Sequence, residues 1–65
     1  MTEYEQIVVH KIEVHTFDIT RSLSDLLAEL ETERFEEASS VVVALNFHVL
    51  EIIRLHRKLL KDEDL

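Results

Sequence analysis

The sequence predicts a small, mainly α-helical domain with one N-terminal strand, folded as an intertwined dimer. Residues 7–20 are crowded with β-branched side chains, which favour strands over helices. Residues 21–34 and 39–65 instead carry apolar side chains at spacings of three and four, the pattern of an amphipathic helix. The chain has only 65 residues, yet 46% of them are hydrophobic. A monomer of that length buries too little surface to use them all, so we expect self-association.

Composition narrows the class of protein. The 65 residues form at most one domain, and the absence of cysteine excludes disulfides and thiolate metal sites. A formal charge of −7 repels nucleic acid and suits a basic protein partner. The first residues are polar, and the longest uncharged run, residues 38–50, is too short to span a bilayer. We therefore expect a cytoplasmic protein without a membrane partner.

The strand is predicted over residues 7–20. Ile12, Val14 and Thr16 alternate with polar residues, as in a strand with one buried face. Phe17 and Ile19 then shift the apolar residues to the other phase, which indicates a bulge near Thr16.

The first helix is predicted over residues 21–34. Its apolar positions follow the i, i+3, i+4, i+7 rule and are Leu23, Leu26, Leu27 and Leu30. Ser22, with Asp25 three residues later, resembles a capping box, so we expect the helix to begin near residues 20–22.

The second helix is predicted to begin at the serine pair, because Ser39 or Ser40 can accept hydrogen bonds from the free N–H groups of a new helix. Residues 34–38 would then be the connection. This helix is apolar almost all round, which is typical of a helix that is buried on every side in an oligomer. The predicted oligomer interface comprises Ile12, Phe17, Ile19, Leu26, Leu30, Val42, Leu45, Phe47, Val49 and Ile52.

An alternative fold is a hairpin of two long helices. Apolar residues at spacings of three and four also run through the chain as Val9, Ile12, Thr16, Ile19, Leu23, Leu26 and Leu30, and then as Phe35, Ala38, Val42, Leu45, Val49, Ile52, His56 and Leu59. Two such helices would dimerise as a four-helix bundle. The β-branched residues, the internal helix-start signals and a turn without Gly, Pro, Asn or Asp favour the strand over this alternative.

The stretch RFEEASSVVVAL, residues 34–45, resembles the turn and second-helix start of ParD-type antitoxins of the ribbon-helix-helix family. The resemblance rests on Arg34, Phe35, Ala38, Ser39, Val41, Val42, Ala44 and Leu45. It implies a dimer whose paired strands face DNA, with contact candidates Lys11, His15, Thr16 and Ser39. We expect the C-terminal segment, residues 52–65, to bind a protein partner through Leu55, Leu59 and Leu60.

No catalytic motif or convincing metal site is evident. His10 with Glu13, and His48 with Glu51, have spacings that could present two ligands to an ion, but four histidines scatter this way easily. We therefore predict no metal, no cofactor and no enzymatic activity.

The predicted function is that of a dimeric antitoxin-like or transcription-regulator-like interaction protein. It would associate with itself, as a homodimer or tetramer, and with another protein. DNA binding on its own would be weak or absent, because basic residues are few before Arg21. The hairpin alternative implies an adaptor or interaction protein that does not bind nucleic acid.

Overall fold

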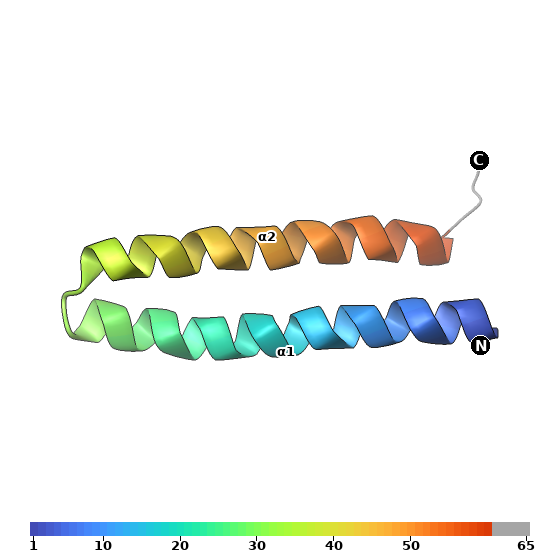
Figure 1. Cartoon of the computed structure of the whole chain (residues 1–65), viewed down its shortest axis with the longest axis horizontal. Helices are drawn as coiled ribbons and strands as arrows, with labels where there is room; N and C mark the ends of the chain where they lie inside the picture. The colour runs from blue at the N-terminus through green and yellow to red at the C-terminus, as the bar shows by residue number, and fades with distance from the viewer. Residues whose placement is uncertain (61–65) are drawn as a thin grey trace.

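The computed structural model describes residues 1–60, which form two antiparallel helices joined by a tight turn (Figure 1). Helix α1 spans Glu3–Glu31 and helix α2 spans Phe35–Leu60. No strand occurs within residues 1–60. The predicted ribbon-helix-helix fold with an N-terminal strand is therefore wrong, and the chain is the helical hairpin of the alternative.

Helix α1 begins at a capping box that the sequence reading missed. The Thr2 hydroxyl accepts a hydrogen bond from the Glu5 backbone N–H at 3.0 Å, and the Glu5 carboxylate accepts one from the Thr2 backbone N–H at 2.8 Å. Glu3 and Glu5 also place negative charge in the first turn, where the helix dipole favours it. A helix that starts here runs directly into the region predicted to be a strand.

The β-branched region is helical because its packing outweighs its local preference. Thr16 and Thr20 donate their hydroxyls to the carbonyls of Ile12 and Thr16, at 2.9 and 3.0 Å, so neither hydroxyl competes with the helix. The change of phase in the apolar residues near Thr16, which indicated a bulge, reflects the alternating spacings of three and four residues between apolar positions on a helix. It leaves Phe17 outside, 76% exposed, and Ile19 facing α2.

Neither internal serine start is used. Ser22 lies in the middle of α1, and Ser39 lies more than one turn inside α2, where its hydroxyl donates to the Phe35 carbonyl at 3.2 Å. The predicted capping roles of Ser22, Ser39 and Ser40 are therefore wrong. Residues 35–38, predicted to be connection, form the first turn of α2.

The turn closes without glycine. The backbone N–H groups of Glu33 and Arg34 bond to the carbonyls of Leu30 and Glu29, at 3.1 and 2.8 Å, which is the Schellman pattern at a helix C-terminus. This pattern needs one residue in the left-handed region, and Glu33 adopts it, with φ of 60°. The absence of Gly and Asn argued against a hairpin, but a single residue with an unfavourable backbone angle is enough to make one.

The two helices meet along one seam with heptad spacing. Its members are Val8, Ile12, His15, Ile19, Ser22, Leu26 and Glu29 in α1, and Ala38, Val41, Leu45, His48, Ile52, Leu55 and Leu59 in α2. Every one of them is buried or half-buried. Spacings of three and four keep each row on the side of its helix that faces the other helix, so the pattern holds the two antiparallel helices in contact along their length.

This seam is a thin core. Among residues 1–60, only Val8, Ala38 and Leu55 are buried, with 3, 5 and 3% of their surface exposed. The radius of gyration is 15.0 Å, against about 11 Å for a compact domain of this length. The hairpin is a single layer of two helices, whereas a stable domain needs at least two packed layers.

The serine geometry generates a stability prediction. Ser39→Ala should leave the free energy of unfolding unchanged or raise it by about 0.5 kcal/mol or less, because Ala is the better residue inside a helix. Thr2→Ala removes the true cap and should lower it by about 1 kcal/mol. Urea melts followed by circular dichroism compare the two variants. A loss near 1 kcal/mol for Ser39→Ala would contradict a continuous α2.

The turn generates a second prediction. Glu33→Gly should raise the free energy of unfolding by about 1 kcal/mol, since glycine adopts a left-handed backbone without the cost of a β-carbon. Glu31→Gly, two residues earlier inside α1, should lower it by about 0.5–1 kcal/mol. The same melts serve for both variants. Destabilisation by Glu33→Gly would show that the turn does not adopt this conformation.

Candidate functional site

The hairpin has two open sides, one on each side of the seam, and they differ in chemistry. The side called here the apolar flank is formed by Val9, Leu23 and Leu30 of α1 and Phe35, Val42 and Val49 of α2. The opposite side, the polar flank, is formed by Lys11, Asp18 and Asp25 of α1 and Glu37, Glu51 and Lys58 of α2. Both sets follow from the seam, because residues next to a heptad seam position lie on one side of it or the other.

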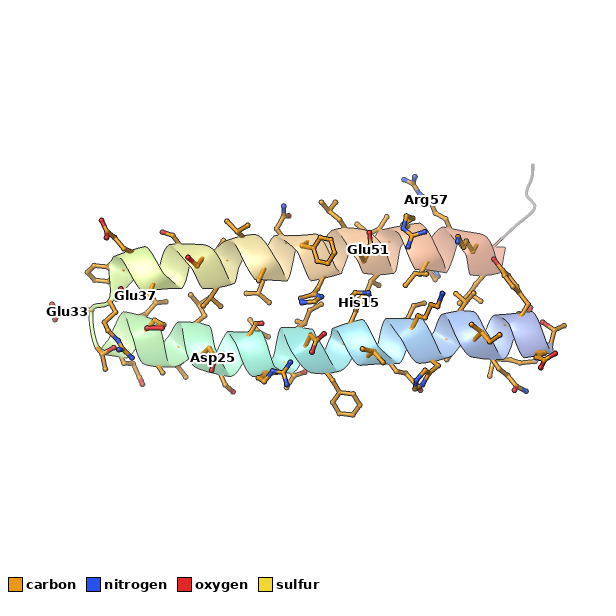
Figure 2. The ribbon with its side chains drawn as sticks, viewed as in Figure 1. His15, Asp25, Glu33, Glu37, Glu51 and Arg57 are labelled. Carbon is orange, nitrogen blue, oxygen red and sulfur yellow. The ribbon has the colours of Figure 1, made fainter. Side chains whose placement is uncertain are left out.

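The centre of the seam holds a pair of histidines. Nδ1 of His15 and Nδ1 of His48 lie 2.8 Å apart, at hydrogen-bond distance, so one ring donates and the other accepts. Their ring centroids are 5.0 Å apart, and the Phe47 ring stands edge-on to both. Figure 2 places His15 between the two helices. A polar pair therefore interrupts the apolar contact of the hairpin.

Carboxylates of the polar flank stand beside this pair. Asp18 Oδ2 lies 3.9 Å from His48 Nε2, and Asp18 Oδ1 accepts a hydrogen bond from Arg21 at 2.6 Å. Glu51 Oε1 accepts from Arg54 at 2.8 Å, and this bond holds the pKa of the Glu51 carboxyl below its usual value. The same bond raises the pKa of the Arg54 guanidinium.

The two helices contribute matching segments to this cluster. HTFDITR, residues 15–21, and HVLEIIR, residues 48–54, share the order His, acid three residues later, Ile, and Arg three residues after the acid. Because the helices are antiparallel, the two segments run in opposite directions from the His15–His48 pair, as they would about an approximate two-fold axis between the two rings. The repeat is visible in the sequence, but only the pairing of the two helices brings its two histidines together.

The apolar flank is hollowed near the turn. One shallow groove there is lined by Leu26, Leu30, Phe35, Ala38, Ser39, Val42 and Val43, from both helices. A second hollow lies on the outer side of α1, between Glu13, Thr16, Phe17 and Thr20. Five of the six residues of the apolar flank are exposed by 43 to 61%. Exposed apolar side chains grouped in this way are typical of an interaction surface, although Thr16 interrupts the row on α1 between Val9 and Leu23.

The structure separates the predicted DNA-contact residues. Lys11 and Thr16 lie on opposite sides of α1, His15 is in the seam, and Ser39 is on α2 near the turn. They were placed on a strand and a helix start that do not exist. The arrangement implied for them by the ribbon-helix-helix resemblance is therefore wrong.

The predicted oligomer-interface residues divide into two groups. Ile12, Ile19, Leu26, Leu45 and Ile52 are half-buried in the seam within one chain. The others remain exposed and are Phe17, Leu30, Val42, Phe47 and Val49. Those exposed on the apolar flank are Leu30, Val42 and Val49, whereas Phe47 stands at the histidine pair.

Of the predicted partner-binding residues, Leu55 is buried in the seam at 3% exposure and Leu59 is half-buried. Leu60 is 63% exposed. Residues 61–65 of the predicted partner-binding segment lie outside the described part of the chain. Helix α2 is long and apolar enough to cross a membrane, by length and composition alone.

No protein-family model matches this chain, and no curated protein or solved structure matches it.

The histidine pair generates a third prediction. Replacing one histidine by leucine leaves the other ring without its partner, whereas replacing both gives an apolar contact. In a double-mutant cycle, His15→Leu and His48→Leu should therefore couple by about 1 kcal/mol in the free energy of unfolding. The cycle of His10→Leu with His48→Leu is the control and should give no coupling, since His10 is 75% exposed and contacts Glu13 instead. Additive effects of the two seam substitutions would contradict the register of the hairpin.

Proposed function

We propose that the protein is a self-associating helical hairpin that acts as an interaction module and does not bind nucleic acid through a β-ribbon. The observation that carries this proposal is the single helical layer, in which only three side chains of residues 1–60 are buried and the apolar flank is left exposed. A hairpin of this kind gains its second layer from another molecule.

A second copy of the same chain fits this surface. The row of apolar residues that the sequence predicts for the hairpin combines residues of the seam with residues of the apolar flank. On α1, the row contains the seam residues Ile12, Ile19 and Leu26 and the flank residues Leu23 and Leu30. In a four-helix bundle, the positions beside the hairpin seam complete the core. If two copies placed their apolar flanks face to face, each copy would cover the apolar flank of the other.

The distribution of charge favours an antiparallel arrangement of the two copies. The turn end, residues 22–40, has six acidic residues and one arginine, a formal charge of −5. The open end, residues 1–11 and 50–60, has four basic and three acidic residues, a formal charge of +1. An antiparallel pair places each turn end over the open end of its partner, whereas a parallel pair brings the two acidic ends together.

The fourth prediction is that the protein is a dimer and that Val42→Asp dissociates it. The new carboxylate would have to be buried unpaired in the dimer core, although it is solvated in the separate hairpin. Ser40→Asp is the matched control, since it adds the same charge two residues away on the same helix, outside the apolar flank. Sedimentation at micromolar concentration should give a dimer for the natural chain and Ser40→Asp, and a smaller, less helical species for Val42→Asp.

A folded monomer of the natural chain at that concentration would refute the proposal. Flotation with phospholipid vesicles by a monomeric chain would assign the apolar flank to a membrane surface instead. The chain has no cysteine, so a spin label at Glu33→Cys reports the orientation cleanly. Labels in an antiparallel dimer should be separated by a distance on the order of the 46 Å length of the hairpin. Labels in close contact would contradict the charge argument.

A further inference from the structure

We propose that His15, Asp18 and His48 form a binding site for a divalent transition-metal ion of the zinc type. One ligand atom from each of these residues lies within 4.8 Å of the other two. Two imidazoles and a carboxylate are a donor set that zinc accepts, with the fourth position left to water. Calcium and magnesium prefer oxygen ligands and fit these donors poorly.

The cluster differs from a bound geometry in two distances, one shorter and one longer than a zinc site requires. Tetrahedral zinc with bonds of about 2.0–2.1 Å places its ligand atoms about 3.3 Å apart. The His15 and His48 Nδ1 atoms are closer than this, at 2.8 Å, because they share a proton. Asp18 Oδ2 is farther away, at 3.9 Å from His48 Nε2. Rotation of the His48 side chain and a small inward movement of Asp18 would bring all three ligands around one ion. The hydrogen bond between the rings would then break, and its proton would move to Nε2 of the ring that donated it, so that both imidazoles bind the ion in the neutral form.

The surroundings support a positive ion at this position. Asp18 uses Oδ1 to accept from Arg21, which fixes the carboxylate and leaves Oδ2 directed toward the histidines. Glu51 contributes a second carboxylate from α2 on the same flank, and its Oε1 accepts a hydrogen bond from Arg54 at 2.8 Å. Outer groups that orient ligands and add negative charge are a regular part of metal sites.

The site remains accessible in the proposed dimer. Asp18 and Glu51 belong to the polar flank, so a second copy seated on the apolar flank would not cover them. The side chains of His48 and Asp18 are 19 and 27% exposed, which leaves a path for a hydrated ion. Metal binding therefore does not depend on the proposed self-association, and the two can be tested separately.

The test is a calorimetric titration of the natural chain with Zn²⁺, together with the visible absorption spectrum of the Co²⁺-loaded chain. We expect one ion per chain at micromolar concentration and Co²⁺ bands typical of a four-coordinate site. His15→Gln, His48→Gln and Asp18→Asn should each weaken zinc binding about tenfold or more. His10→Gln is the matched control, because His10 and Glu13 have the same spacing as His15 and Asp18 but lie on the outside of α1.

Circular dichroism of each variant establishes that it is folded before titration. Asp18→Asn changes a residue at the edge of the seam and keeps the test informative should a histidine variant lose its structure. The proposal would be overturned by the absence of saturable Zn²⁺ binding or by unchanged binding in folded Asp18→Asn. Loss of binding in His10→Gln, or a ratio of one ion to two chains, would also overturn it.

Discussion

The structure depends on one seam between two antiparallel helices. Spacings of three and four hold each row of seam residues on one side of its helix, and this contact alone keeps the long hairpin together. Only Val8, Ala38 and Leu55 are removed from water among residues 1–60. A core of this size cannot supply much of the free energy that folding 65 residues requires. The apolar surface left exposed beside the seam therefore matters to the stability of the protein as much as the seam itself.

The seam also fixes which residues share a side. The turn at Glu33 sets the pairing of the helices, and this pairing places His15 opposite His48. A shift of either helix by one residue would separate the rings and move the neighbouring acids away. Polar pairs inside an apolar contact often specify register at some cost in stability. In the metal site proposed above, the same pair would bind an ion together with Asp18.

The two sides of the hairpin have separate uses in this view. In the proposed dimer, the apolar flank would complete a core against the second copy. The polar flank borders the histidine pair of the seam and would remain open to solvent in that assembly. Such a division would let a chain of 65 residues self-associate and bind an ion with little interference between the two proposed sites. Its charge is concentrated near the turn, where a basic partner would be attracted.

The sequence by itself determined the amphipathic apolar pattern that both helices use, whereas the single domain and the partner surface that it indicates stay predictions. It did not decide between strand and helix for residues 7–20, because local preference and helical periodicity disagree there. Tertiary structure decided in favour of the helix, since continuous packing along α2 outweighs the preference of β-branched residues for strands. The pairing of His15 with His48 likewise depended on the fold. Residues 33 positions apart become neighbours only when the turn sets the register of the two helices.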